Sequence, residues 1–320
     1  MKIGIDVMGG DFAPKESIAG AILAFETLPS DDTLVLIGNR EIILETLNKT
    51  GLNPDNFEIV HSSEQIEMGE HPTKAFSKKP NSSIAIGFKL LKTKKIDAFS
   101  SAGNTGAILV GSIYMINSIP GIIRPCIASL VPKENGGNNI ILDVGINPDT
   151  KPDVMYQFGI LGSLYAKSVL KINNPRVGLL NIGEEDEKGN LLCQSSFRLM
   201  KGALDFNYIG NIESGDIFND NVDVIVCDGF TGNIILKLTE SIYNIIKKRG
   251  LEDDYFKRYN YENYGGTPIL GINSTVIIGH GKSNAIAFKN MILSSKNVFE
   301  AKLPQEIKLA LDRCPQKLKV

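Results

Sequence analysis

The sequence predicts an α/β fold with a mixed, mostly parallel sheet, in one continuous domain that spans residues 1–320. Two observations favour this fold. Strand-like apolar runs alternate with helix-like runs along the chain, which is typical of parallel strands joined by helices. One hairpin signal interrupts the alternation, because a turn rich in Gly and Asn at residues 134–138 separates two apolar runs. The hairpin adds antiparallel strands and makes the sheet mixed.

The first third of the chain has a β-α-β-α-β order. The first expected helix has apolar residues at Ile18, Ile22 and Phe25, which is the spacing of one helix face. His71 and Pro72 are expected in a polar connection. In this part we expect strands at residues 3–8, 33–37, 57–61 and 96–99, and helices at 17–28, 41–47, 83–91 and 107–116.

The rest of the chain continues the same plan. The helix that ends at Lys248 has conventional end signals, with Lys247 in its last turn and Gly250 just beyond it. In this part we expect strands at residues 126–131, 139–144, 177–181, 222–227 and 275–278, helices at 152–170, 191–199 and 234–248, and a helical C-terminal tail.

Composition excludes several classes of protein. The 34 basic and 36 acidic residues leave a net charge of -2, which argues against a general nucleic-acid binder. No apolar run reaches the roughly 18 residues of a membrane span. The chain opens directly on a strand without the pattern of a secretory signal, so we expect a cytoplasmic protein.

The cysteines and histidines predict neither disulfides nor a metal site. No C-x-x-C pair occurs, so the thiols are expected to be reduced and mostly buried. No His or Cys spacing suits a metal, and we expect none. The residues concerned are Cys126, Cys193, Cys227, Cys314, His61, His71 and His280.

The segment from Ser100 to Ala107 lies between an expected strand and an expected helix, which is the setting of a phosphate-binding loop. Gly103 and Gly106 permit a tight or positive-φ backbone whose N–H groups converge on one point. Ser101, Asn104 and Thr105 add short polar groups. The plainer alternative is a strand-to-helix turn in which the polar side chains only cap the helix.

Several other expected strands also end in glycine with a short polar residue. Ligands of open α/β sheets bind at this carboxyl edge, so we expect one shared anion site. Carboxylates beside a phosphate repel it, and for Asp6, Asp11, Asp143 and Asp228 we favour hydrogen bonding to loop amides. Arg124 either pairs with phosphate or is structural. The further candidates are Gly9, Gly10, Asp11, Arg124, Asp143, Asp228, Thr231, Gly232, Asn263 and His280.

Two nucleotide motifs are incomplete. Residues 279–283 resemble the end of a Walker A loop, but Val276 stands where that motif needs glycine. The same glycines approach a dinucleotide fingerprint without completing it, and they come too late in the chain. We therefore expect no nucleotide cofactor.

Taken together, the strand-end motifs resemble one family. They are Met8–Pro14, Ser101–Ala107, Leu142–Gly145, Leu180–Gly183 with Lys188–Asn190, Asp228–Asn233 and Asn263–Gly266. This series resembles the PlsX family, the acyl-ACP:phosphate acyltransferases of bacterial phospholipid synthesis. The resemblance implies a three-layer α/β/α sandwich related to the isocitrate/isopropylmalate dehydrogenase-like fold, working as a homodimer. It also implies acyl carrier protein and inorganic phosphate as partners, no cofactor, and an acyl phosphate product passed to a membrane acyltransferase.

By the same resemblance, Lys188 and Asn233 match the catalytic Lys and Asn of the family. Their plainer readings are a solvated loop charge and a helix N-cap. We expect phosphate to be positioned by Ser101, Gly103, Asn104, Thr105, Gly106, Thr231 and Gly232.

The chain departs from the family in one segment. Only residues 245–261 stand where the family has a long basic helical hairpin that engages membrane and dimer partner. Membrane contact at the inner face is therefore left open, while Arg249, Lys257 and Arg258 could receive the acidic carrier protein. Three alternatives remain: a short-chain phosphate acyltransferase that uses coenzyme A, a metal- and NAD-dependent decarboxylating dehydrogenase, and a non-enzymatic carrier-protein scaffold.

Overall fold

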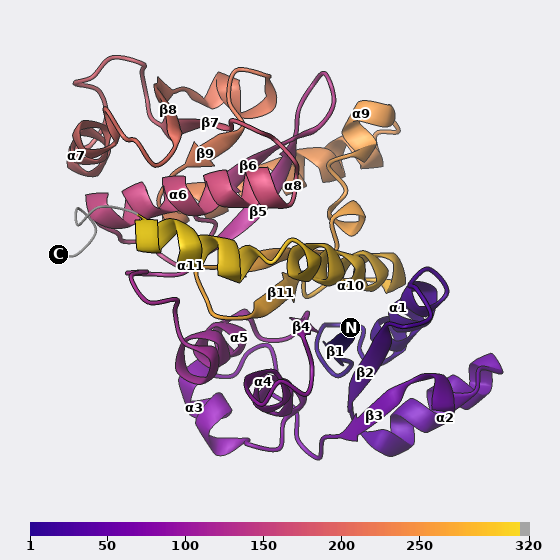
Figure 1. The fold of residues 1–320 in the computed structure, drawn as a ribbon. Coiled ribbons are helices and arrows are strands. Elements are labelled where there is room, and N and C mark those ends of the chain that lie inside the picture. The colour runs from indigo at the N-terminus through magenta and orange to yellow at the C-terminus, as the bar shows by residue number, and fades with distance from the viewer. Residues whose placement is uncertain (314–320) are drawn as a thin grey trace. The chain divides into compact units, whose positions relative to one another are not determined.

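The computed structural model describes residues 1–313, and Figure 1 shows their fold. These residues form two compact units. Unit 1 comprises Met1–Asn117, Tyr261–Pro268 and Ile272–Glu300. Unit 2 comprises Ser118–Asn260, Ile269–Gly271 and the remaining residues from 301. Cys314 lies outside the described residues. The expectation of a single domain stays a prediction.

Unit 1 has a mixed sheet that is parallel except at one strand. β1 pairs with β2 and β4, β2 with β3, and β4 with β11, all in parallel, whereas β10 pairs antiparallel to β11. The resulting order is β3-β2-β1-β4-β11-β10. The strands are β1 (Lys2–Asp6), β2 (Thr33–Gly38), β3 (Glu58–His61), β4 (Ala98–Ser101), β10 (Gly266–Leu270) and β11 (Thr275–Gly279).

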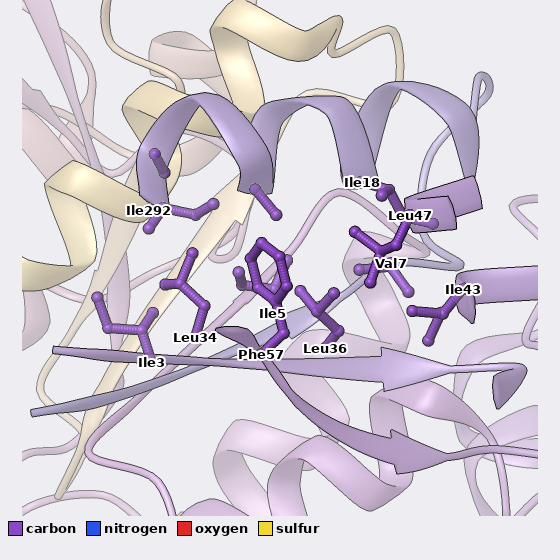
Figure 2. Close-up of a cluster of buried hydrophobic side chains, with 12 residues drawn as sticks. Ile3, Ile5, Val7, Ile18, Leu34, Leu36, Ile43, Leu47, Phe57 and Ile292 are labelled. Atoms are coloured by element: carbon purple, nitrogen blue, oxygen red, sulfur yellow. The ribbon is translucent and has the colours of Figure 1, made fainter. Parts of the chain in front are cut away.

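The alternation of side chains along β1 sets what covers each face of this sheet. Ile3, Ile5 and Val7 are completely buried in a cluster that also contains Ile18 and Ile292 (Figure 2). Helices α1, α2 and α10 contribute to that cluster, whereas α4 packs on β1, β2 and β4. The helices of unit 1 are α1 (Lys15–Phe25), α2 (Arg40–Thr50), α3 (Pro72–Lys78), α4 (Ser83–Lys92), α5 (Thr105–Gly111) with a π-helical extension (Ser112–Ile116), and α10 (Ala285–Glu300).

Unit 2 has a second mixed sheet. β5 pairs antiparallel to β6 and to the last residues of β10, and β6, β9, β7 and β8 follow in parallel. Helix α6 packs on this sheet and contacts α7 and α11, and α8 contacts β6. The elements are β5 (Cys126–Pro132), β6 (Asn138–Leu142), α6 (Pro152–Ser168), β7 (Arg176–Leu180), α7 (Leu191–Met200), β8 (Asn207–Ile212), β9 (Val224–Val226), α8 (Gly229–Lys248), α9 (Asp254–Lys257) and α11 (Leu303–Arg313).

The structure confirms the predicted fold class and the hairpin that makes the sheet mixed. His71 lies in the expected polar connection, but for Pro72 that prediction is wrong, because Pro72 begins α3 and its missing N–H costs a first helical turn nothing. Strands β8 and β10 lack a sequence signal. Among the helices of residues 1–313, none combines the length and the apolar character needed to cross a membrane.

Candidate active site

Two loops of unit 1 touch at the carboxyl edge of its sheet. Asp6 ends β1 and is fully buried, and its carboxylate accepts hydrogen bonds from Ser101 Oγ at 2.7 Å and the Met8 amide at 3.0 Å. The Gly103 amide in turn donates to Ser101 Oγ at 3.0 Å. A side chain at Gly9 would bring Cβ within 2.7 Å of the Gly103 nitrogen. The two loops are therefore in backbone contact through Gly9.

The buried carboxylate of Asp6 has a raised pKa. Burial disfavours the charged form and outweighs the hydrogen bonds from Ser83, Ser101 and the loop amides, which favour it. Ser83 belongs to α4, and no local sequence pattern indicates that it reaches Asp6. The expectation that Asp6 bonds to loop amides is confirmed.

Asn104 holds the predicted phosphate loop to a neighbouring loop. Its Oδ1 accepts from the Ala107 amide at 3.0 Å and caps α5. Its Nδ2 donates to the backbone oxygens of Glu67, Met68 and Glu70 at 3.0–3.1 Å. The capping expected of this loop therefore exists. The contact of Asn104 with phosphate stays a prediction.

The glycines of this loop serve close packing. Neither Gly103 nor Gly106 has a positive φ, so that part of our explanation is wrong, and what both glycines permit is a tight backbone. A Cβ on Gly106 would lie 2.3 Å from Pro72 Cγ, and one on Gly103 would lie 3.2 Å from the Asp6 carboxylate. Thr105 is exposed at the start of α5.

The loop after β11 joins the same cluster. The Asp11 amide donates to the Gly281 oxygen at 2.7 Å, and Gly10 has a φ of +106° that suits only glycine. His280 accepts from the Lys282 amide at 3.1 Å and packs against Tyr261. The predicted candidate Asn263 ends a short 3-10 helix that contacts α10. Most candidates of unit 1 thus converge in the loops after β1, β4 and β11, whereas Asn263 lies in the 3-10 helix that contacts α10.

In unit 2, Asp143 follows β6 and organises the loop behind it. Oδ1 accepts from the Ile127 amide at 2.9 Å, and Oδ2 accepts from the amides of Ile146 and Asn147 at 3.1 and 2.6 Å. Burial raises the pKa of Asp143 although these bonds oppose the rise. The expected loop-bonding role of Asp143 is confirmed, and the side-chain amide of Asn147 is a partner that the sequence did not indicate.

The first turn of α8 rests on that loop. A Cβ on Gly232 would lie 2.0 Å from the Asp143 backbone oxygen, and one on Gly229 would lie 2.6 Å from the Asp143 carboxylate. Asp228 caps α8 by accepting from the Thr231 amide at 2.9 Å and from Thr231 Oγ1 at 2.7 Å. The plainer reading of Asn233 as an N-cap is therefore wrong, because Asp228 is the cap.

Lys188 lies in the loop after β7, and Asn233 lies near the start of α8, the helix that follows the paired strand β9. Both side chains are exposed, and within the described residues of unit 2 neither makes a hydrogen bond or an ion pair with its side chain. Asn233 lies beside Gly145, where a Cβ would be 3.5 Å from Asn233 Oδ1. The lysine stem lies against Gly183, where a Cβ would be 2.9 Å from Lys188 Cγ.

Arg124 precedes β5 at the same sheet edge, because β5 runs antiparallel to β6. Its Nη1 donates to the Asp149 oxygen at 2.9 Å, as expected of a structural arginine. The candidates of unit 2 thus gather in neighbouring loops. The expectation that all of the predicted loops form one anion site stays a prediction.

The described cysteines are free thiols. Cys126 and Cys227 are buried, and burial together with the nearby Asp143 raises the pKa of both. Cys193 is half-buried, and burial likewise raises its pKa, with the charge of Asp228 adding to the rise. Across residues 1–313, no three His, Cys, Asp or Glu side chains are grouped so that they could hold a metal ion.

A family model described as "Fatty acid synthesis protein" matches residues 1–306 of this chain. This chain belongs to that family. Relatives in it are named phosphate acyltransferase: one from Halothermothrix orenii is 42% identical over 98% of this chain and 99% of its own. Another from Dictyoglomus turgidum is 40% identical over 98% of both chains. The resemblance to the PlsX phosphate acyltransferases is therefore confirmed over nearly the whole chain.

Solved structures outside the phosphate acyltransferase family share the fold. A phosphotransacetylase from Streptococcus pyogenes aligns with a TM-score of 0.67 at 18% identity, covering 93% of this chain and 94% of its own. A 4-hydroxythreonine-4-phosphate dehydrogenase from Salmonella typhimurium aligns with a TM-score of 0.53 at 15% identity, covering 94% and 99%. The relation to dehydrogenase-like and phosphate acetyltransferase folds that the sequence implied is confirmed at the level of fold.

Proposed function

We propose that this chain transfers a fatty acyl group from acyl carrier protein to inorganic phosphate, for phospholipid synthesis. A phosphate oxygen attacks the thioester carbonyl carbon, a C–O bond forms, the C–S bond breaks, and the carrier thiolate leaves and takes up a proton. Phosphate is partly dianionic at neutral pH and the thiolate is a good leaving group, so a general base contributes little. The reaction needs an oriented phosphate and a donor for the carbonyl oxyanion.

The observation that carries the proposal is that the side chains of Lys188, in the loop after β7, and Asn233, near the start of α8, make no hydrogen bond or ion pair within the described part of unit 2. The neighbouring side chains of Asp143, Asp228 and Thr231 are engaged in hydrogen bonds within unit 2. The polar atoms of Lys188 and Asn233 are available, as far as the described part of unit 2 is concerned. They are also the two residues that match the family's catalytic Lys and Asn. We assign Lys188 to the negative charge of phosphate or oxyanion, and Asn233 to a hydrogen bond with the reacting carbonyl or phosphate.

We propose further that the loop at residues 101–106 positions phosphate through its backbone. Ser101 and Asn104 are engaged with Asp6 and with the loop at residues 67–70. The amides of Thr105 and Gly106 lie in the first turn of α5, where no intrahelical acceptor exists, and they have no acceptor in the described residues of unit 1. Backbone N–H groups of this kind suit an anion.

The homodimer is part of the proposal, and a surface of α8 supports it. One side of α8 buries Gly232 and Tyr243. The opposite side carries an apolar row that we call the α8 stripe: Phe230, Ile234, Leu238, Ile242 and Ile245, each 48–62% exposed. A continuous apolar row on a helix is typical of an interface. We assign it to a second copy of this chain in a cytoplasmic dimer, which hands its product to a membrane acyltransferase.

The experiment is detection of acyl phosphate as its hydroxamate after incubation with acyl carrier protein thioester and phosphate. We expect product with the carrier-linked donor and little with acetyl-coenzyme A. A preference for acetyl-coenzyme A would favour the short-chain enzyme instead. Binding of the carrier protein without product would contradict an enzymatic role.

A further inference from the structure

Three consecutive backbone oxygens around Lys188 are each bound by a side-chain amide. Asn181, which follows β7, donates from Nδ2 to the oxygen of Lys188 at 3.1 Å. Gln194 on α7 donates from Nε2 to the oxygens of Glu187 and Gly189 at 2.8 and 3.1 Å. The backbone is thus bound at the lysine and on both sides of it.

Asn211 on β8 secures the earlier part of the same loop. Its Nδ2 donates to the Glu185 oxygen at 3.0 Å, and the side chain is only 7% exposed. The Lys188 amide donates to the same Glu185 oxygen at 3.1 Å. The turn that leads into the lysine is therefore fixed from the sheet.

Two glycines let the loop close around these amides. Gly189 has a φ of +86°, and a Cβ there would lie 2.1 Å from Asn181 Oδ1. Gly183 leaves room for the lysine stem, as described above. A side chain at either position would displace the loop or the lysine.

The hydrogen bonds that form α7 do not involve the side chain of Gln194. The side chain of Asn190 caps α7 by accepting from the Cys193 amide at 2.9 Å. The Gln194 amide is bonded to the Asn190 oxygen inside the helix at 3.0 Å. The Gln194 side chain is free of both tasks and is directed back over the loop, where it binds two oxygens that α7 does not need.

Four acidic residues at positions 184–187 precede Lys188, yet the ammonium group pairs with none of them. A flexible lysine loop would bring that charge onto a neighbouring carboxylate, because opposite charges attract at short range. A fixed backbone keeps the stem against Gly183 and the ammonium group available. We propose that Gln194, with Asn181, is a positioning residue that holds the backbone of Lys188 so that its ammonium group stays available for the reaction. This inference rests on the proposed role of Lys188.

The test compares Gln194→Ala and the near-isosteric Gln194→Glu, which keeps the size but cannot donate, with Arg198→Ala on the exposed side of α7 as the control. We expect both Gln194 variants to lower kcat by about five- to tenfold with little change in KM for phosphate, and the control to stay near the parent protein. In Lys188→Ala the added Gln194→Ala should cost almost nothing, because residues that act through one another are not additive.

Hydrogen exchange gives a readout that does not depend on turnover. Amides of residues 184–189 should exchange faster in Gln194→Ala, while those of the sheet remain protected. Unchanged exchange in this loop, or an equal loss of kcat with and without Lys188, would overturn the inference. Absence of acyl phosphate from the parent protein would instead overturn the proposed function, and the exchange result would still report on the loop.

Discussion

The hydroxyl of Ser101 donates a 2.7 Å hydrogen bond to the buried carboxylate of Asp6. The same relationship recurs in unit 2, where Thr231 donates to Asp228 at 2.7 Å. In both units a hydroxyl that the sequence suggested for phosphate is bonded to an aspartate at a strand end. These side chains shape the loops, and the phosphate role that we propose falls chiefly to backbone amides.

Gly106 should tolerate no side chain. Gly106→Ala places Cβ 2.3 Å from Pro72 Cγ, so we expect a loss of about 1–3 kcal/mol in the free energy of unfolding. Gly69→Ala is the matched control, because a Cβ there meets nothing within 4 Å. Urea unfolding of the two variants checks this. Equal stability of both would show that α3 moves away from the loop at little cost.

Two variants separate the roles of Asn104. Asn104→Asp keeps the acceptor that caps α5 but loses the donor to the oxygens of residues 67–70, whereas Asn104→Ala loses both. We expect Asn104→Ala to be the less stable by about 1 kcal/mol, the usual worth of a cap. Both should raise KM for phosphate more than KM for the acyl donor. A larger effect on the donor would assign this loop to the acyl side.

Lys188→Ala should lower turnover by at least about tenfold while the fold persists, because its side chain makes no hydrogen bond or ion pair with the described residues of unit 2. Steady-state kinetics with circular dichroism measures both effects. Lys248→Ala, at the exposed end of α8, is the charge-matched control. Near-normal turnover of Lys188→Ala would remove the lysine from the mechanism.

Asn233→Ala should also lower turnover by about tenfold or more, since it removes the proposed hydrogen bond to the reacting group. Asn244→Ala on the same helix is the control of identical chemistry, because Asn244 is exposed and lies about three turns further along α8 than Asn233. Single-turnover measurements would show whether the loss lies in the chemical step. Equal rates for the two variants would contradict the assignment.

Asp223 should make folding stability depend on pH. Burial opposes its ionisation, but hydrogen bonds from Arg176 and Lys133 outweigh burial and lower its pKa from 3.8 to about 2. Because the native pKa lies below the unfolded one, this contribution is complete above pH 3.8 and is lost as the pH falls towards 2. Asp223→Asn should cost about 2 kcal/mol or more at neutral pH, since the buried Lys133 then keeps only the longer 3.7 Å ion pair with Asp220.

Urea unfolding of Asp223→Asn and the parent protein, at neutral pH and near pH 3, measures this difference. The difference in the free energy of unfolding between the two proteins should be smaller at the lower pH. Asp149→Asn, an exposed aspartate of the same unit, should show no such trend. If this difference in the free energy of unfolding did not change with pH, the ion pair of Asp223 would not be its cause.

Leu238→Glu should weaken the proposed dimer, because it places a charge in the middle of the α8 stripe. Light scattering coupled to gel filtration would then report a smaller mass than for the parent protein. Leu204→Glu is the control, since Leu204 is 97% exposed outside the stripe. An unchanged mass would leave the stripe without a role in dimerisation.

The sequence predicted much of this architecture because hydrophobic periodicity and strand-end glycines are local signals. It missed β8, whose bulge and Gly210 at a φ of +106° break the alternation, and β10, which contains Pro268. Several hydrogen-bond partners of the candidate site residues could not be predicted, because they are far away in the sequence. Asp6 and Ser101 lie 95 positions apart, and Asn211 reaches the Lys188 loop from a strand without a signal.

The raised pKa values of Cys126, Cys193 and Cys227 have a practical consequence. Alkylating reagents attack thiolates, so these three native thiols should react slowly near neutral pH. A Lys188→Cys variant, with Cys314 first replaced by Ser, would carry an exposed thiol that reacts faster. Treatment with 2-bromoethylamine would then install a lysine analogue at position 188, and recovery of activity would test the need for an amine there by chemical rescue.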